Sequence, residues 1–275
     1  MRDAISAGEV PGPRIVAADA PITITGGHCW YMSDQCDTEA EVAASVRAHA
    51  EGGADVVKVM LTGGFLHPEG DTPHRPVYDE PVLRALVGQA HEGGMRVAVH
   101  AHGVDGIRRA VDAGVDTVEH CTMTTRGGVR YDAALARRIA EAGIVVVPTL
   151  NRRWLDDDLP WTTRDVALDV LRRLREDGVR LAVGTDCGID GVGHADHLWG
   201  LRTLVASGMT PSQAFAAATE TGAEACGLSG EVGRLEPGSS ADLIAVRADP
   251  RYDLDALAEP AAVMTRGALV HEVRP

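Results

Sequence analysis

The sequence predicts an α/β protein built from repeated strand–helix units. Short apolar runs alternate with longer helical segments, with about 25 to 35 residues for each unit. Glycine follows most of the predicted helices, where it is the favoured residue for ending a helix. Of the 275 residues, 45% are hydrophobic and only 4% aromatic, so a large core must be built from Ala, Val and Leu.

Six apolar runs are predicted to be the strands of this repeat. They span residues 14–17, 56–60, 96–100, 117–120, 144–148 and 180–184. A short helix before Gly8 and an extended piece at residues 22–25 lie outside it. Helices are expected over residues 38–51, 79–92, 104–113, 131–142, 163–177, 195–206 and 210–226. A (β/α)8 TIM-type barrel needs eight strands, so the pattern predicts such a barrel without its first strands, with about six βα units present.

The last part of the chain has a different pattern. Residues 242–246, 262–264 and 268–271 form short apolar runs with no helix between them, which predicts the remnant of a small C-terminal β-sandwich. The sequence therefore predicts two domains. Residues 1–229 would form the incomplete barrel, and residues 230–275 the C-terminal part of the sandwich.

Composition excludes several kinds of partner. The formal net charge of −14 argues against nucleic acid and anionic membranes, and no cluster of Lys and Arg opposes this. No apolar run is long enough to span a membrane, and no signal peptide opens the chain. The five cysteines are scattered and odd in number, which indicates a reducing, cytoplasmic compartment. The composition leaves open whether the chain forms a homo-oligomer.

Four predicted strands end in, or contain, a side chain suited to metal binding. These side chains are Lys58, His100, His120 and Asp186. Because the carboxyl ends of barrel strands meet at one mouth, we expect the four to converge. Imidazole nitrogens and carboxylate oxygens are ligands that Zn²⁺ and similar ions prefer. A plain ammonium is not a ligand, but a carbamylated Lys58 is a carboxylate that can bridge two metal ions.

Simpler interpretations remain beside these. Lys58 can point out at its strand end and pair with a carboxylate, and a single histidine at a strand end is often structural. His102 is expected in the turn after the strand that ends at His100, where it would contact substrate or His100. His28 and His194, in glycine-rich loops, are further candidates for substrate binding.

These motifs resemble those of the amidohydrolase superfamily, in its imidazolonepropionase-like branch. That branch includes metal-dependent dipeptidases that cleave Xaa-Pro or Xaa-Arg bonds. The resemblance covers nearly the whole chain. It is carried by motifs similar to those of the family's strands 4, 5, 6 and 8, namely Val57-Lys58-Val59-Met60 with Gly63-Gly64, Val99-His100-Ala101-His102-Gly103, Val118-Glu119-His120 and Gly184-Thr185-Asp186.

The resemblance implies a metal-dependent hydrolase that acts on the C–N bond of an amide or peptide. Lys58, His100 and His120 would bind one divalent ion and Asp186 another, with one or two Zn²⁺ ions in all. Asp186 would also act as general base on a metal-bound hydroxide and pass the proton to the leaving amine. The expected substrate is a small molecule or is dipeptide-like.

One departure from the family concerns its first strand, which carries a His-x-His pair. The His-x-His of this chain, His100 to His102, belongs to strand 5 instead. We therefore expect a fragment or misassigned start of a longer enzyme, or a chain that has lost its first metal site. A chain that folds in another way, or pairs with a partner, is a further alternative. The alternative function is a truncated, catalytically impaired or non-catalytic amidohydrolase-like subunit for binding or assembly. A phosphate-binding TIM barrel ranks lower, because no glycine-rich phosphate loop follows the last strands.

Overall fold

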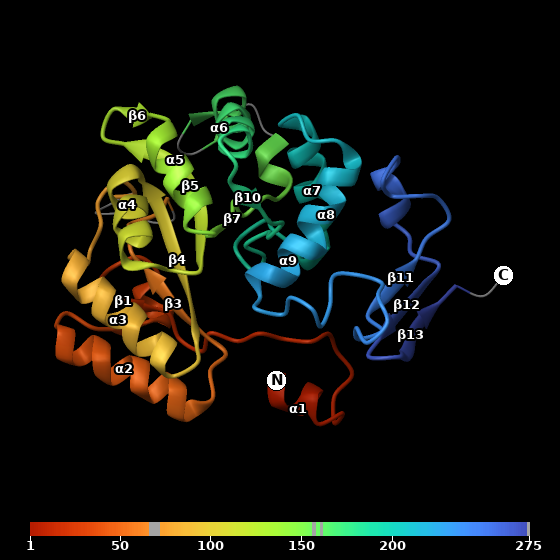
Figure 1. The fold of residues 1–275 in the computed structure, drawn as a ribbon, viewed down its shortest axis with the longest axis horizontal. Helices are drawn as coiled ribbons and strands as arrows, with labels where there is room; N and C mark the ends of the chain where they lie inside the picture. The colour runs from red at the N-terminus through yellow and green to blue at the C-terminus, as the bar shows by residue number, and fades with distance from the viewer. Residues whose placement is uncertain (66–71, 156–157, 160–161, 274–275) are drawn as a thin grey trace. The chain divides into compact units, whose positions relative to one another are not determined.

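The computed structural model describes residues 1–65, 72–155, 158–159 and 162–273. The chain forms two compact units, Met1–Ile144 and Val145–Pro275, and each is described by itself (Figure 1). Among the helices of these described ranges, none combines the length and apolar character needed to cross a membrane.

Unit 1 is organised around a sheet with the strand order β5-β4-β3-β1-β2. Neighbouring strands in this series run parallel, and β6 pairs antiparallel with β5. The predicted α/β class is confirmed, but within the unit the series ends at β2 and forms no closed ring. The strands are β1 (Ile22–Thr23), β2 (Asp34–Gln35), β3 (Val56–Met60), β4 (Arg96–Gly103), β5 (Thr117–Thr125) and β6 (Gly128–Val129).

Helices connect the parallel strands of unit 1, as the predicted repeat requires. They are α1 (Arg2–Ser6), the 3-10 turn η1 (Trp30–Met32), α2 (Glu39–Gly52), α3 (Glu80–Glu92), α4 (Val104–Ala113) and α5 (Ala133–Glu141). Along one face of the sheet, α3 packs between α2 and α4 (Figure 1). The core of the unit lies between sheet and helices, where Val97 and Val99 of β4 and Leu83 of α3 are fully buried.

The start of α2 shows why these helices form where the sequence predicts them. Thr38 accepts a hydrogen bond from the backbone N–H of Glu41, and the Glu41 carboxylate accepts one from the backbone N–H of Thr38. This reciprocal capping box satisfies two donors that a helix start leaves without partners. At the other end, Gly53 adopts φ 75°, a left-handed conformation that glycine tolerates.

Unit 2 contains a parallel strand pair, a short hairpin, several helices and a separate small sheet. In it β7 pairs parallel with β10, β8 pairs antiparallel with β9, and β11-β12-β13 form an antiparallel sheet. The predicted small C-terminal β-structure is thus confirmed. The elements are β7 (Val145–Val147), η2 (Arg152–Leu155), β8 (Asp158–Leu159), β9 (Thr162–Thr163), α6 (Arg164–Glu176), β10 (Arg180–Leu181), η3 (His194–Asp196), α7 (His197–Ala206), α8 (Pro211–Ala218), α9 (Glu220–Ala225), β11 (Leu243–Ala245), η4 (Leu254–Leu257), β12 (Ala262–Thr265) and β13 (Ala268–Glu272).

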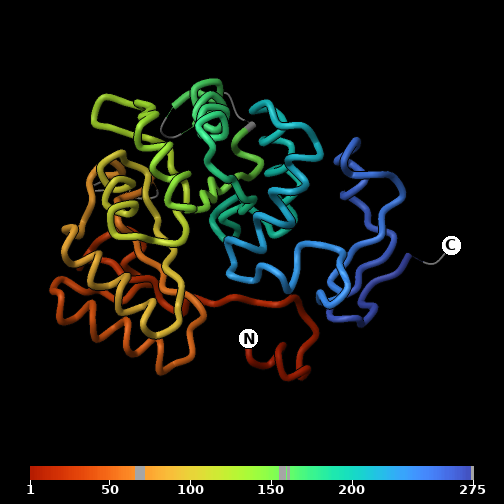
Figure 2. Tube along the Cα trace, viewed as in Figure 1, coloured from red at the N-terminus to blue at the C-terminus, as the bar shows by residue number. Residues whose placement is uncertain are grey.

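The structure corrects two predicted elements. Residues 14–17 form no strand, because Asp55 binds both backbone groups of Ala17: its carboxylate accepts from Ala17 N at 2.8 Å, and its N–H donates to Ala17 O at 2.9 Å. Figure 2 shows this stretch as an extended segment between α1 and β1. The helix predicted over residues 210–226 is broken at Thr219, whose φ of −116° and ψ of −80° separate α8 from α9. The predicted domain division at residues 229 and 230 stays a prediction.

Candidate metal centre

Strand β4 carries two histidines on one face of the sheet. Side chains alternate along a strand, so His100 and His102 share a face with Ala98, while Val97 and Val99 point to the opposite face. Both histidines are buried, with exposed fractions of 3% and 5%. The prediction that His102 lies in a turn after the strand is wrong, because β4 continues to Gly103 and its backbone pairs there with Thr124 of β5.

Strand β5 brings a third histidine to these two by an irregular path. In the ladder His120 lies opposite Ala101, so regular alternation would turn its ring away from His100. His120 and Cys121 instead have φ of 68° and 51°, in the left-handed region. The His120 ring centroid lies 4.5 Å from that of His100 and 4.3 Å from that of His102.

A fourth ring comes from the loop after β1. His28 is buried and stacks on His100, with 4.4 Å between the ring centroids. Gly64 permits this position, because a Cβ there would lie 2.3 Å from Cε1 of His28. The structure therefore gathers the predicted residues His28, His100, His102 and His120 within unit 1.

Hydrogen bonds orient two of these rings. Nε2 of His100 lies 3.1 Å from the carbonyl oxygen of Gly63, which can only accept, so a neutral His100 keeps the lone pair of Nδ1 free. Nδ1 of His102 lies 3.2 Å from Oγ1 of Thr122, which leaves its Nε2 toward the other rings. Such partners fix the orientation of histidines that bind metals.

The electrostatics of the cluster favour neutral imidazoles. Burial lowers the pKa of His100 well below its ordinary value, and the neighbouring His120, His102, His28 and Lys58 lower it further. Desolvation, followed by the charges of His102, Lys58 and His28, lowers the pKa of His120 in the same way. A metal ion needs unprotonated imidazole nitrogens, so both side chains are in the ligand form at neutral pH.

The donor set fits a divalent ion. One ring nitrogen from each of His100, His102 and His120 can be chosen so that the three lie within 4.8 Å of one another. Three imidazoles with room for a further ligand are a common donor set for catalytic zinc. Of the described groups of His, Cys, Asp and Glu, this one has the geometry of a metal centre.

Lys58 lies on the same face of the sheet and is paired. Its Nζ lies 2.5 Å from Oε2 of Glu119, whose other oxygen accepts a hydrogen bond of 2.8 Å from Thr117 Oγ1. Register explains the pairing, because Lys58 lies opposite Ala98 and Glu119 lies opposite His100. No role of Glu119 was predicted from the sequence. The available signal was a carboxylate next to His120, two residues after Thr117 on a strand.

Asp186 and His194 belong to unit 2, and the structure places them there without testing their predicted roles. Asp186 follows β10 with a left-handed φ of 57°, and its side chain is exposed. The carbonyl of the preceding Thr185 accepts a hydrogen bond of 3.0 Å from the Asn151 side chain. His194 opens η3 and is also exposed. Their convergence with the histidines of unit 1 stays a prediction.

Unit 1 is thus a parallel α/β unit in which two neighbouring strands and a loop gather four histidines, three of which could hold a metal ion. The chain belongs to the amidohydrolase family, which residues 1–270 match.

Individual relatives agree with this assignment. The chain is 27% identical to ochratoxinase from Aspergillus niger over 94% of its own length, and it spans 60% of the length of that protein. It is 31% identical to imidazolonepropionase from Rhizobium meliloti, over 71% of this chain and 42% of that one. A crystal structure of a Xaa-Pro dipeptidase with bound methionine in the active site superposes with a TM-score of 0.83 at 31% identity, covering 99% of this chain and 71% of the other.

Proposed function

We propose that the protein is a metal-dependent hydrolase that cleaves the C–N bond of an amide or peptide. The convergence of His100, His102 and His120 in a chain of the amidohydrolase family carries this proposal. Zn²⁺ is the proposed ion, because imidazole nitrogens suit it. When bound, the ion supplies an activated water and polarises the scissile carbonyl.

The protein's own residues hold the ligands in position. The Gly63 carbonyl accepts a hydrogen bond from Nε2–H of His100, so Nδ1 is the proposed ligand atom. The contact between Thr122 and Nδ1 of His102 likewise leaves Nε2 of His102 for the ion. The stacking of His28 on His100 supports a role for His28 in contacting substrate at the edge of the centre.

The proposal also gives roles to three residues outside the histidine cluster, namely Asp186, Lys58 and His194. Asp186 is the proposed general base and further metal ligand, which takes a proton from the attacking water and delivers it to the leaving amine. A carbamylated Lys58 would place a negative group beside the Glu119 carboxylate, so it would need Glu119 to turn away or bind a proton. His194 is proposed to contact substrate.

The names of the relatives and the state of the cysteines support the proposed substrate class and compartment. The names of the relatives, which include a Xaa-Pro dipeptidase and an imidazolonepropionase, support a small or dipeptide-like substrate with a C–N bond. None of the five cysteines forms a disulfide, which supports a reducing, cytoplasmic location.

Metal content and hydrolysis together test the proposal. We expect purified protein reconstituted with Zn²⁺ to hold about one ion in the histidine centre, by elemental analysis after dialysis. The variants His100→Ala, His102→Ala and His120→Ala should each weaken zinc binding about 100-fold or more. The exposed His271 supplies the control His271→Ala, which should bind as the wild type does. A chain that binds no zinc, or binds it equally in all four variants, would refute the centre.

Activity separates the enzyme from a non-catalytic binding or assembly subunit. We expect the zinc-loaded protein to hydrolyse members of a panel of dipeptides and N-acyl amino acids, and Asp186→Asn to abolish this while leaving zinc at the histidines. Zinc binding without hydrolysis of any member would favour the non-catalytic subunit.

A further inference from the structure

The loop that carries Asp186, residues 185–192 of unit 2, has a defined internal structure. Asp186 adopts a left-handed φ of 57°, which is uncommon for a residue other than glycine and persists where the surroundings hold it. The backbone N–H of Gly188 donates a hydrogen bond of 3.2 Å to the carbonyl oxygen of Val192, and the N–H of Val192 donates one of 3.1 Å to that of Ile189. These bonds close the far part of the loop on itself.

Asn151 ties the start of this loop to the neighbouring strand. The segments that contain β7 and β10 continue side by side, since the N–H of Ala182 donates a hydrogen bond of 2.9 Å to the carbonyl oxygen of Val146. The buried side-chain amide of Asn151 donates one of 3.0 Å to the carbonyl oxygen of Thr185. Its side-chain oxygen accepts one of 3.1 Å from the N–H of Arg153, at the start of η2. Because both halves of this buried amide are bonded, it fixes the peptide that leads into the proposed base.

Arg153 ties the far end of the same loop. Its guanidinium donates a hydrogen bond to the main-chain carbonyl oxygen of Asp190. Gly191 allows this approach, because a Cβ there would lie 3.1 Å from Nη2 of Arg153. Asn151 and η2, which are adjacent in the sequence, therefore hold the loop on both sides of Asp186.

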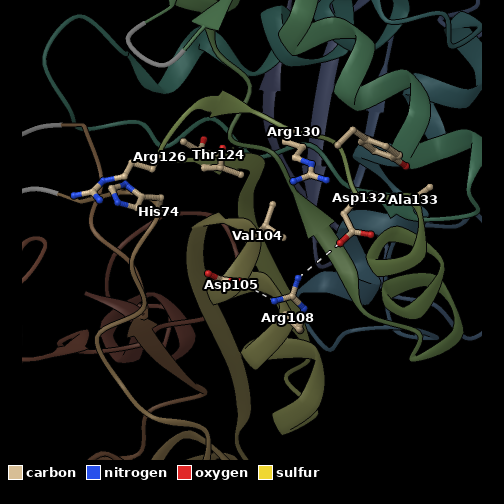
Figure 3. Close-up of a pocket in the computed structure, with 11 residues that line it drawn as sticks. His74, Val104, Asp105, Arg108, Thr124, Arg126, Arg130, Asp132 and Ala133 are labelled. Atoms are coloured by element: carbon tan, nitrogen blue, oxygen red, sulfur yellow. Dashed lines mark hydrogen bonds and ion pairs between the residues drawn. The ribbon is translucent and has the colours of Figure 1, made fainter.

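The contact of Arg153 differs in kind from those of an arginine in unit 1. The guanidinium of Arg108 lies 2.7 Å from Asp105 and 3.8 Å from Asp132, at the wall of a cavity of about 560 Å³ (Figure 3). Those partners are carboxylate side chains, whereas the acceptor that Arg153 meets is a main-chain carbonyl. Its hydrogen bond therefore fixes the course of the backbone, and a charged donor makes such a bond roughly twice as strong as a neutral one.

We propose that Asn151 and Arg153 are positioning residues that hold Asp186 in place as the general base. The inference rests on the proposed function, because Asp186 has its role there. The two residues act through the backbone on either side of Asp186 and not on the substrate. A general base must lie within hydrogen-bond reach of the proton that it takes, and a displacement of about 1 Å can lower the rate about 100-fold.

Hydrogen–deuterium exchange tests these contacts without requiring turnover. In the EDTA-treated full chain, followed by mass spectrometry, we expect the amides of residues 185–192 to exchange at least about 10-fold faster in Asn151→Ala and in Arg153→Met than in the wild type, because each variant loses a hydrogen bond that holds the loop. Arg153→Lys keeps a charged donor and should restore slow exchange. Arg152→Met is the matched control, since it removes the same charge from the exposed neighbour in η2 and should exchange as the wild type does. Unchanged exchange in both Asn151→Ala and Arg153→Met overturns the inference.

Kinetics separate positioning from a merely structural role. Arg153 is exposed, so its variants should fold and keep the melting temperature and the zinc content of the wild type. With the best substrate of the panel, we expect Arg153→Met to lower kcat about 10-fold while KM changes less than about twofold, and Arg153→Lys to recover most of kcat. Faster exchange with a wild-type kcat overturns the inference and leaves the proposed function intact. Absence of hydrolysis by the unsubstituted, zinc-loaded chain refutes the proposed function, and the inference falls with it.

Discussion

Strands β4 and β5 are neighbours in one parallel sheet, and they deliver histidines to the same cluster by different means. In β4 ordinary alternation places His100 and His102 on one face. In β5 the backbone enters the left-handed region at His120, Cys121 and Met123. This conformation turns the His120 ring to the face of His100, whereas regular alternation would place it on the opposite face. A histidine on a regular strand can thus be assigned to a face from its position, whereas one on an irregular strand cannot.

The irregular strand persists because its surroundings hold it. A non-glycine residue in the left-handed region costs on the order of 1 kcal/mol or more, and such residues concentrate at functional sites. Cys121 and Met123, two of the left-handed residues, are completely buried, so their packing holds this part of the strand. Burial also raises the pKa of Cys121 to about 12, so this thiol is a packing group and not a nucleophile.

The largest expected effect concerns the tightly packed end of β4. Gly103→Ala would place a Cβ 2.6 Å from Cα and 2.8 Å from the carbonyl oxygen of His74, and main-chain atoms cannot yield cheaply. We expect the free energy of unfolding to fall by about 1–3 kcal/mol, measured by denaturant titration. Gly88→Ala in α3 is the control, because its Cβ meets nothing within 4 Å and alanine favours a helix. Equal stability of the two variants would contradict the close packing of β4.

A second test asks whether β5 is irregular in solution. In the metal-free protein we expect His120→Val to be less stable than His120→Asn by about 1–2 kcal/mol, because a β-branched residue tolerates the left-handed region poorly and Asn tolerates it well. At position 100, on the regular strand, Val should be at least as favourable as Asn. The same order at both positions, measured by chemical denaturation, would argue that β5 is a regular strand.

The smallest effect is a pH dependence that the buried rings impose. The pKa of His100 is lowered in the folded metal-free protein, so the unfolded chain binds more protons below its ordinary value of 6.5. Stability should therefore be complete above that pH and fall as the pH decreases, by about 0.8 kcal/mol at pH 6 for His100 alone. Denaturation curves of EDTA-treated protein between pH 5 and 8 should show a shallower slope for His100→Gln than for the exposed-site variant His271→Gln. Parallel slopes would show that His100 titrates normally.

Local patterns predicted most of the fold. Apolar runs and glycine stops located β3, β4 and β5 and the helices between them, because helix and strand periodicity is written in neighbouring residues. The strand predicted at residues 14–17 was wrong because a contact with a distant residue decides the conformation there. Its apolar character suits a strand, but the backbone of Ala17 is bound by Asp55, which lies 38 positions away in the sequence.

Part of the candidate site was predicted from the strands. His100, His120 and Lys58 were identified from their strands, and His100 and His120 lie in the cluster. His102 was misplaced because Gly103 suggested a turn, while in the structure it continues the ladder with β5. The pairing of Lys58 with Glu119 depends on the register of three neighbouring strands, which no local pattern contains.

The sequence by itself determined the α/β class, the order of the βα units and the residue types of a metal centre, because each follows from local periodicity and side-chain chemistry. The meeting of His120 with His100 was expected from the sequence, but tertiary structure alone decided that His28 and His102 join them and how the His120 ring reaches their face of the sheet. That decision depends on ladder register, on a left-handed turn in β5 and on the close approach allowed by Gly64. These are contacts between distant segments, whose energies arise only when the whole unit packs.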